Sequence, residues 1–451
     1  MGSTADVETV LGRALGGTVE GLERLSSGAS RLTSAFDLAR GDGTRRRLVL
    51  QQERGDGSDL GAKVDLQAAL LSAAAAAQVP APRVVAAGAA GGIDPGWLVV
   101  ERLDGETIPR RLLRDAEWAG ARAALTGQCA RALAAIHAID PDTIVGLPRH
   151  DPLRDPLSVL DGLGEVRPAL ELGVRWLECN PSVPGRRTTV HGDFRMGNLL
   201  VDESGLRAIL DWELAHAGDP AEDLGWLCAR AWRFGGAGHV GGFGDLPTLL
   251  AAYEDAGGDP MDQERVEWWE AYAAVKWAVI CALQASAHLS GAVRSVELAA
   301  IGRRICESEW DLLVVLGFSP AHDDGVPDRA SGASSLMPFG RPTKTELVEA
   351  VREHLEHVRT DARDERARFE ARVARNALQV VERELALGES IIEAHGRRLS
   401  ALGFADDAAL GSSLRSGAHD ATLREVGAAL AGSVRDQLLV ANPSYLEEPA
   451  T

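Results

Sequence analysis

Cysteine is scarce in this 451-residue chain and is never paired at close spacing. The five cysteines are widely separated and form no Cys-x-x-Cys motif: Cys129, Cys179, Cys228, Cys281 and Cys306. A chain of this length has material for two or three domains and needs no disulfides to hold a core together. We therefore expect reduced, mostly buried thiols in a cytoplasmic protein.

Long apolar runs and a targeting signal are also missing. The longest uncharged run, 277–293, is interrupted by Gln284, Ser286 and His288, which is typical of a buried helix and not of a membrane span. The segment Met1–Val10 is polar and lacks the basic-then-apolar order of a signal peptide. The sequence therefore predicts no association with a membrane.

Basic residues are too few for a general nucleic-acid-binding protein. The chain has 47 Lys and Arg against 66 Asp and Glu, a net charge of −19 at pH 7, whereas binding to phosphate backbones needs Lys and Arg. Residues 151–330 hold much of the negative charge. This region would attract a cationic ligand, although a plain solubilising surface explains the charge equally well.

The order of the predicted elements indicates an α+β fold. Strand-like segments at 22–25, 32–38, 47–52, 83–87 and 96–103 surround one alanine-rich helix, 62–78. The tripeptide Gly41-Asp42-Gly43 is a hairpin signal. From residue 115 onward helical periodicity dominates, interrupted by short apolar strands within 188–212. We expect a small antiparallel sheet with one helix, followed by a mostly helical lobe.

The C-terminal part of the chain forms a separate helical module in this prediction. Residues 319–344 are rich in Pro, Gly, Ser and Asp without periodicity, which predicts a linker. Beyond it, apolar residues recur at helical spacing in 347–358, 369–381 and 423–434. We expect three or more packed helices over 345–446. They are a candidate surface for a protein partner or for self-association.

The segment that carries chemistry runs from Val190 to Val201 and continues in 208–213. Phosphoryl transfer from ATP needs a carboxylate near the acceptor hydroxyl, an oxygen ligand for Mg²⁺ and a second carboxylate for the metal. Asp193, Asn198 and Asp211 are such a set, each beside an apolar stretch that predicts a short strand. Strands on both sides would fix these side chains as the chemistry requires.

The His-Gly-Asp-x-x-x-x-Asn box at 191–198 and the Ile-Leu-Asp-Trp-Glu strand at 209–213 resemble the aminoglycoside phosphotransferase / choline kinase branch of the protein-kinase-like fold. The resemblance covers about residues 20–317 and is greatest to kinases associated with acyl-CoA dehydrogenases. It implies a bilobal fold with a nucleotide-binding N-lobe, 1–104, and a helical C-lobe with the catalytic loop, 105–318. The module at 345–446 resembles a helical domain of unknown function that accompanies such kinases.

The resemblance also implies a role for each candidate residue. It implies Asp193 as the catalytic base, His191 as the catalytic-loop residue that orients the loop, and Arg195 as a further catalytic residue. The implied Mg²⁺ ligands are Asn198 and Asp211, and the implied supports of the catalytic loop are Asp219 and Asp223. The implied nucleotide-binding positions are Ser27, Gly28 and Ser30 in a short loop, Gln51 and Gln67, and Glu101 and Leu103 in the hinge that binds adenine. ATP and Mg²⁺ are the implied cofactors.

Two of these positions depart from the family pattern. Active kinases of this fold have a Lys and a Glu where this chain has Gln51 and Gln67. The two amides could pair with each other, at the cost of a charge-assisted hydrogen bond of about 1.5–3 kcal/mol. Arg31 is a candidate replacement charge, although a solvated strand residue is the more typical role. If the family's Lys and Glu positions corresponded to residues one or two places away, Glu53 or Asp65 would take part in this pair instead.

Three further signals are better explained by structure than by chemistry. His354 and His357 lie at i, i+3 on the charged face of a helix and lack further metal ligands. Trp268 and Trp269 are expected in the core of the helical lobe. For His137, a buried capping role is favoured over catalysis.

The sequence thus predicts an ATP- and Mg²⁺-dependent phosphotransferase that moves the γ-phosphoryl group to a hydroxyl of a small molecule. A hydroxyacyl-CoA-like catabolite ranks first as acceptor, and an aminoglycoside-like or amino-alcohol acceptor second. The alternative is a catalytically weak or silent kinase-like nucleotide-binding scaffold that acts through its C-terminal helices. Gln51 and Gln67 motivate this alternative, while the intact set of Asp193, Asn198 and Asp211 argues against it.

Overall fold

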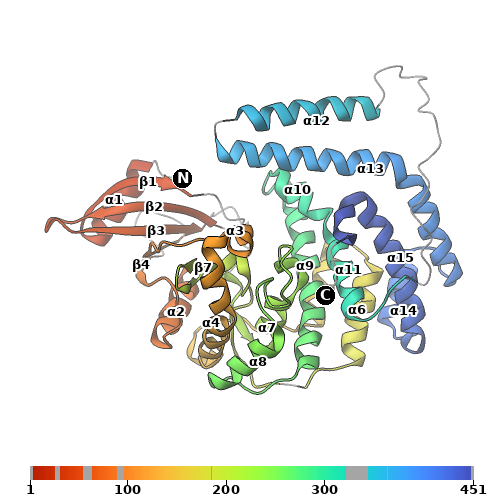
Figure 1. The fold of residues 1–451 in the computed structure, drawn as a ribbon, viewed down its shortest axis with the longest axis horizontal. Coiled ribbons are helices and arrows are strands. Elements are labelled where there is room, and N and C mark those ends of the chain that lie inside the picture. The colour runs from red at the N-terminus through yellow and green to blue at the C-terminus, as the bar shows by residue number, and fades with distance from the viewer. Residues whose placement is uncertain are drawn as a thin grey trace. The chain divides into compact units, whose positions relative to one another are not determined.

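A computed structural model of the chain describes residues 4–25, 31–53, 63–88, 96–183, 185–320, 344–362 and 364–447 (Figure 1). The chain divides into two compact units, the first formed by 1–150 with 183–270 and the second by 151–182 with 271–451. No helix among the described residues is long and apolar enough to cross a membrane.

A five-stranded antiparallel sheet opens the first unit, with the order β1-β2-β3-β5-β4. Its strands are β1 (Thr18–Arg24), β2 (Arg31–Ala39), β3 (Arg45–Glu53), β4 (Val84–Gly88) and β5 (Trp97–Glu101). The predicted hairpin joins β2 to β3. At its turn Gly43 has φ 82°, a conformation that favours glycine, and its N–H donates to the carbonyl of Arg40 at 3.0 Å.

The two faces of the sheet are covered by different helices. On one face Leu48 and Leu50 are fully buried in a cluster with Leu11 of α1 (Thr4–Leu15), a helix that the sequence analysis did not predict. Val49 lies on the other face, against the cluster that contains residues of α2 (Val64–Ala76). Because strand side chains alternate between faces, Gln51 shares the face of Val49.

Helices and two small two-stranded sheets make up the rest of the first unit. They are α3 (Pro109–Arg114), α4 (Ala119–His137), β6 (Thr188–Val190), β7 (Leu199–Asp202), β8 (Gly205–Ile209), β9 (His216–Gly218), α7 (Ala221–Cys228), α8 (Leu246–Asp255) and the first part of α9 (Gln263–Leu289). β6 pairs with β9 and β7 with β8. The expectation of an antiparallel sheet followed by a mostly helical region is confirmed.

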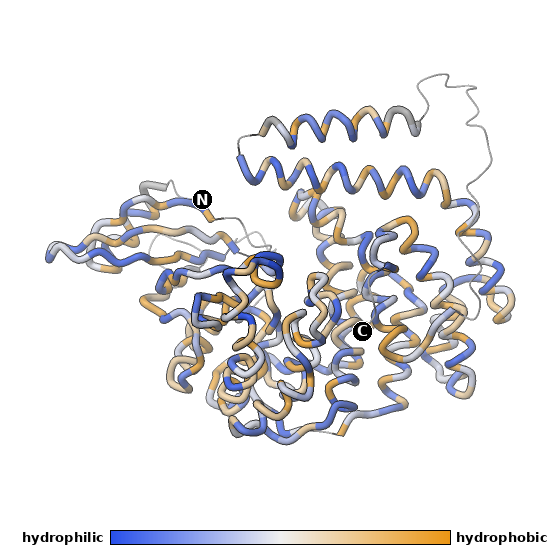
Figure 2. The backbone as a smooth tube through the Cα atoms, viewed as in Figure 1, coloured by the Kyte–Doolittle hydropathy of each residue, from blue (hydrophilic) through white to orange (hydrophobic). Residues whose placement is uncertain are grey.

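The second unit is helical throughout its described residues. Its helices are α5 (Arg154–Leu163), α6 (Pro168–Cys179), the rest of α9, α10 (Val296–Gly302), α11 (Ile305–Val315), α12 (Lys344–Asp361), α13 (Glu365–Ala401), α14 (Asp407–Arg415) and α15 (Leu423–Ala441). One apolar cluster joins α6, α11, α14 and α15. The helices α12 and α13 lie side by side (Figure 1) and are mainly hydrophilic (Figure 2).

Several smaller expectations can be compared with the structure. All five cysteines are free, and only Cys179 is exposed. Trp268 and Trp269 are buried, whereas His354 and His357 are exposed. The predicted linker lies almost wholly outside the described residues. The division into 1–104, 105–318, 319–344 and 345–446 stays a prediction.

Candidate active site

Asp193 lies in the loop between β6 and β7 and is held by three hydrogen bonds to its carboxylate. Its Oδ1 accepts from Arg195 Nε and Trp226 Nε1, both at 2.9 Å, and its Oδ2 accepts from Asn198 Nδ2 at 2.6 Å. The residue is 8% exposed. Each carboxylate oxygen has two lone pairs, so Oδ2 keeps the capacity to accept one more proton. Asp193 is therefore an oriented carboxylate of the kind that general-base catalysis uses.

The hairpin formed by β7 and β8 brings Asn198 and Asp211 to one end. Asn198 immediately precedes β7, and Asp211 follows β8 with Leu210 between them, while Leu199 pairs with Ile209. The N–H of Leu210 donates to the carbonyl of Asn198 at 2.8 Å. In an antiparallel hairpin the residues beyond the open end are neighbours. Asn198 and Asp211 thus both lie close to Asp193.

His191 links the catalytic loop to the end of this hairpin. Its Nδ1 accepts from the N–H of Asp193 at 3.2 Å, so the proton of the neutral ring is on Nε2, which donates to the carbonyl of Leu210 at 3.1 Å. The ring lies 4.8 Å from that of Trp212. His191 touches the backbone on both sides of the site, as an orienting residue would.

Asp223, at the start of α7, is fully buried beneath the loop. Its two oxygens accept from the N–H groups of His191 and Gly192 at 2.8 and 2.9 Å, and from His137 Nε2 at 3.1 Å. His137 in turn contacts the Tyr253 hydroxyl at 2.8 Å. Burial acts to raise the pKa of Asp223, but the bonds from His137 and His191 outweigh it and hold the pKa below its usual value. His137 is thus a buried structural partner.

Replacing Asp223 with Asn should lower the free energy of unfolding by about 3 kcal/mol. The side-chain NH₂ group of the asparagine would face a buried backbone N–H, and that N–H would then have no acceptor. Urea unfolding measures the effect. Asp259→Asn is the matched control, since Asp259 pairs with Arg186 at the surface and should change stability by about 1 kcal/mol or less. Equal losses for the two variants would contradict the bracing role.

Asp219 is placed differently from Asp223. Its carboxylate accepts from the N–H groups of Gly185 and Ala221, both at 2.9 Å, and from Arg265 Nη2 at 2.6 Å. Within the described residues its side chain makes no hydrogen bond to 191–198. Asp219 therefore fixes the segment before β6 and the start of α7, and any support of the catalytic loop is indirect.

Asp211 combines an unusual backbone with burial beside two other carboxylates. Its φ is 64°, in the left-handed region that costs a non-glycine residue about 1 kcal/mol or more. Its carboxylate accepts no hydrogen bond from the described residues. Burial and the neighbouring charges of Glu213 and Asp193 raise the pKa of Asp211 to about 7, although Arg195 and Arg31 oppose them. A cation beside Asp211 would relieve this repulsion.

The donor set fits Mg²⁺ completed by phosphate oxygens. Among the described residues, no three His, Cys, Asp or Glu side chains lie close enough to hold one metal ion by themselves. Asn198 uses its Nδ2 on Asp193, which leaves its Oδ1 free of donors in the described chain. Mg²⁺ is typically bound by one or two protein oxygens together with phosphates and water. These two residues therefore suit a metal that arrives with a nucleotide.

The expected Gln51–Gln67 amide pair is wrong. Gln67 Oε1 accepts instead from Arg31 Nη1, and Gln51 Oε1 is buried with no hydrogen-bond partner among the described residues. Arg31 opens β2 opposite Glu53, and Thr33 pairs with Gln51. Because cross-strand partners share a face, the long Arg31 side chain reaches Gln67 from the same face.

Arg31 is also not the solvated strand residue that the sequence favours. It is 7% exposed, and its Nε lies 4.0 Å from Glu213 Oε2. The two alternatives for the pairing do not occur: Glu53 Oε1 accepts from the N–H of Val64 at 2.9 Å, and Asp65 is exposed. Arg31 is therefore a buried cation beside Gln67.

The remaining nucleotide positions are only partly described. Ser27, Gly28 and Ser30 lie outside the described residues. Glu101 ends β5, and its Oε1 accepts from Arg46 Nη2 at 3.2 Å. The N–H of Leu103 makes no hydrogen bond in the described chain, so it is available to a ligand, as recognition through the backbone requires.

Sequence reasoning missed three contributors to the site. Trp226 donates to Asp193, Glu213 acts on the charge of Asp211, and the ring of Trp232 lies 4.4 Å from the guanidinium carbon of Arg195. Glu213 is the last residue of the Ile-Leu-Asp-Trp-Glu segment that carries the family resemblance. Nothing in the sequence distinguishes the two tryptophans from the other eight.

Comparison with known proteins identifies the family. A model described as "Phosphotransferase enzyme family" matches residues 21–272, more than half of the chain. The chain belongs to the phosphotransferase enzyme family. It is thus a kinase-type enzyme, as the sequence predicts. A second model, described as a domain of unknown function (DUF6285), matches residues 361–445.

Individual relatives of this family member are distant. A crystal structure of a putative aminoglycoside phosphotransferase from Ralstonia eutropha JMP134 has a TM-score of 0.52 at 21% identity and covers 68% of this chain and 96% of its own, which shows the shared kinase-like fold. Macrolide 2′-phosphotransferase MphH from Brachybacterium faecium gives 0.44 at 19% identity, with 66% and 95% covered. Mouse acyl-CoA dehydrogenase family member 10 is 26% identical over 206 residues, 42% of this chain and 19% of its own length.

Proposed function

We propose that this phosphotransferase moves the γ-phosphoryl group of ATP, bound with Mg²⁺, to a hydroxyl of a small molecule. The observation that carries the proposal is the meeting of Asp193, Asn198 and Asp211 at one end of the β7–β8 hairpin. Phosphoryl transfer depends on positioning and charge stabilisation more than on covalent chemistry. A carboxylate base beside two metal-binding oxygens meets that need.

In this mechanism Asp193 accepts the proton of the acceptor hydroxyl. Arg195 and Trp226 occupy Oδ1, so Oδ2 is the oxygen better placed to take it. Asn198 and Asp211 would hold Mg²⁺, which neutralises phosphate charge when bound. Asp223 and His191 keep the loop fixed, and Arg31 is proposed to face the nucleotide phosphates in place of the missing lysine.

The acceptor that we propose is a hydroxyacyl-CoA-like molecule. Support comes from the relative named acyl-CoA dehydrogenase family member 10. An aminoglycoside-like or amino-alcohol acceptor ranks second, supported by the solved structure described as a putative aminoglycoside phosphotransferase. The silent-scaffold alternative is less favoured, because a scaffold has no need of an oriented base and two metal-binding oxygens.

Arg31→Gln should weaken ATP binding by about 10- to 150-fold, the value of one charge-assisted hydrogen bond. Isothermal titration with Mg·AMP-PNP measures the change. Arg31→Lys should retain much of the affinity because it keeps the charge. Arg40→Gln, at the exposed far end of β2, is the matched control and should bind normally. Normal binding by Arg31→Gln would remove Arg31 from the nucleotide site.

The function itself is tested by phosphoryl transfer. The enzyme is incubated with Mg·ATP and a panel of hydroxyacyl-CoAs, aminoglycosides and amino alcohols, and ³¹P NMR follows ADP and new phosphate esters. We expect an ester with at least one hydroxylated acceptor and none in the absence of Mg²⁺. No transfer to any acceptor, together with unchanged nucleotide binding, would favour the scaffold.

A further inference from the structure

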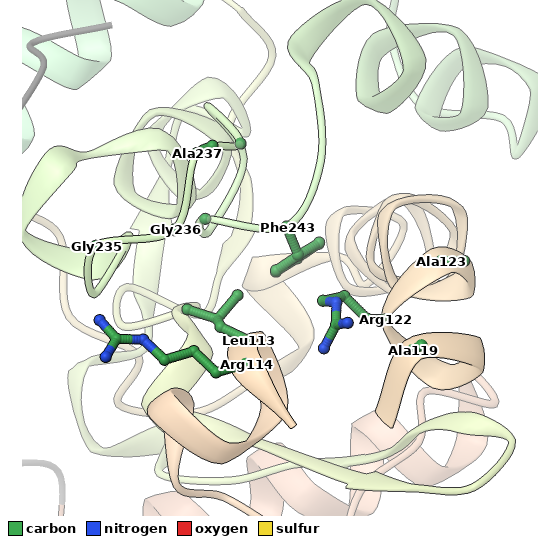
Figure 3. Close-up of a pocket in the computed structure, with 11 residues that line it drawn as sticks. Leu113, Arg114, Ala119, Arg122, Ala123, Gly235, Gly236, Ala237 and Phe243 are labelled. Atoms are coloured by element: carbon green, nitrogen blue, oxygen red, sulfur yellow. The ribbon is translucent and has the colours of Figure 1, made fainter. Parts of the chain in front are cut away.

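A cavity of about 500 Å³ lies in the first unit between α3, α4 and the glycine-rich segment 235–243. Figure 3 shows Arg122 projecting from α4 toward Leu113 and Phe243, while Arg114 extends from α3 on the side of Gly235. Small-molecule sites commonly have volumes of about 300–1,000 Å³. The cavity is therefore large enough to take part of a substrate.

The cavity carries an uncompensated positive charge. Its lining includes Arg114 and Arg122 and no Asp or Glu. Arg122 Nη1 donates to the backbone carbonyls of Leu112 and Asp115, at 2.6 and 3.4 Å. Within the described chain neither guanidinium pairs with a carboxylate. In a protein of net charge −19, an anion in this cavity would meet two arginines that form no ion pair with the described carboxylates.

The glycine-rich wall offers backbone donors in a preformed shape. The N–H groups of Gly235 and Ala237 have no acceptor among the described residues. The segment is closed by mutual hydrogen bonds between Gly238 and Gly242, at 3.3 and 3.1 Å, and a Cβ at Gly236 would lie 2.4 Å from the Gly242 oxygen. Unpaired backbone N–H groups in glycine-rich turns are common anion-binding groups.

A chain of contacts joins this wall to the proposed base. Phe234, next to Gly235, has φ 48°, a strained value for an aromatic residue, and its ring lies 6.4 Å from that of Trp232. The guanidinium carbon of Arg195 is 4.4 Å from the Trp232 ring, and Arg195 Nε bonds to Asp193 at 2.9 Å. The cavity is thus connected to the groups that would activate an acceptor.

We infer that this cavity binds an anionic group of the acceptor, a phosphate ester or a carboxylate, through Arg114, Arg122 and the 235–237 backbone. The inference rests on the proposed function and narrows it, because such a subsite favours an anionic acceptor over a cationic aminoglycoside. The hydroxyl to be phosphorylated belongs to the same molecule, and Asp193 is the base that would accept its proton.

The test is a calorimetric titration of the full chain after saturation with Mg·AMP-PNP, so that the nucleotide site is filled. The probes are coenzyme A, which carries phosphates, pantetheine, which has the same thiol arm without them, and citrate as a carboxylate source. Arg114→Glu should weaken anion binding by about tenfold or more. Ala123→Trp should do the same by filling the cavity.

Arg110→Glu is the matched control, because Arg110 is exposed on the same helix and does not line the cavity. It should change affinity by about threefold or less. Binding of coenzyme A but not pantetheine would show that the cavity binds a phosphate group. Binding of citrate alone would show that it binds a carboxylate. Equal affinity in Arg114→Glu and the parent, or no anion binding by a parent that binds Mg·AMP-PNP, overturns the inference. A parent that fails to bind Mg·AMP-PNP refutes the proposed function instead.

Discussion

Asp193→Asn is expected to lower kcat by about a thousandfold, the size of a typical general-base contribution, while ATP affinity stays close to that of the parent. Both oxygens of Asp193 already face donors, from Arg195, Trp226 and Asn198. An asparagine would therefore point its NH₂ group at a donor in either orientation, and it cannot accept the acceptor's proton. Single-turnover kinetics with Mg·ATP separate this loss from product release.

A matched variant distinguishes lost chemistry from lost structure. Trp226→Phe removes the hydrogen bond from the indole to Oδ1, together with part of a buried ring. It should reduce kcat by about 10- to 150-fold, less than Asp193→Asn does, since a hydrogen bond to a charged group contributes about 1.5–3 kcal/mol. Thermal unfolding of both variants shows whether the loop remains folded. If Asp193→Asn kept parental activity while folded, Asp193 would not be the base.

Asp211→Asn is expected to abolish most activity and yet stabilise the protein without divalent cations at neutral pH. The pKa of Asp211 is raised to about 7 by burial and by Glu213 and Asp193, whereas an unfolded Asp titrates near 4. Between these values the folded state holds a proton that the unfolded state has lost, so stability falls as pH rises from about 4 to 7. An amide carries no such penalty.

The size and sign of this effect can be measured directly. A difference of about 3 pKa units corresponds to at most about 4 kcal/mol, so in EDTA at pH 8 Asp211→Asn should unfold at a higher temperature than the parent. At pH 4 the difference should vanish. Adding Mg²⁺ with AMP-PNP should raise the Tm of the parent more than that of Asp211→Asn. If Asp211→Asn were less stable than the parent at pH 8, the carboxylate of Asp211 would not be destabilised by burial and by Glu213 and Asp193 as proposed.

The catalytic motif could be predicted because its geometry is local. Asn198 and Asp211 flank two short strands, and a hairpin between those strands brings them together whatever the rest of the fold does. Asp223 was implied by the family resemblance, and the structure places it at the start of α7, where its side chain accepts from the loop backbone. The spacing of apolar residues was enough to predict the sheet and the long helices.

What could not be predicted depends on long-range side-chain placement. Arg31 reaches Gln67 only because β2 pairs with β3 in one particular register beside α2. The cavity residues Arg114 and Gly235 lie far apart in sequence and share no motif. Helix α1 was missed because its N-terminal half is polar, and Leu11 and Leu15 are recognisable as core residues only once the sheet they cover is known.

The most direct test is the binding of Mn²⁺, as a paramagnetic substitute for Mg²⁺, to the enzyme with AMP-PNP, followed by electron paramagnetic resonance. The account predicts that the parent binds Mn²⁺ in the ternary complex and that Asp211→Asn and Asn198→Ala each weaken this binding by about tenfold or more. Asp202→Asn, in the exposed β7–β8 turn, should bind as the parent does. Unchanged Mn²⁺ affinity in both Asp211→Asn and Asn198→Ala would show that these residues do not share a metal ion.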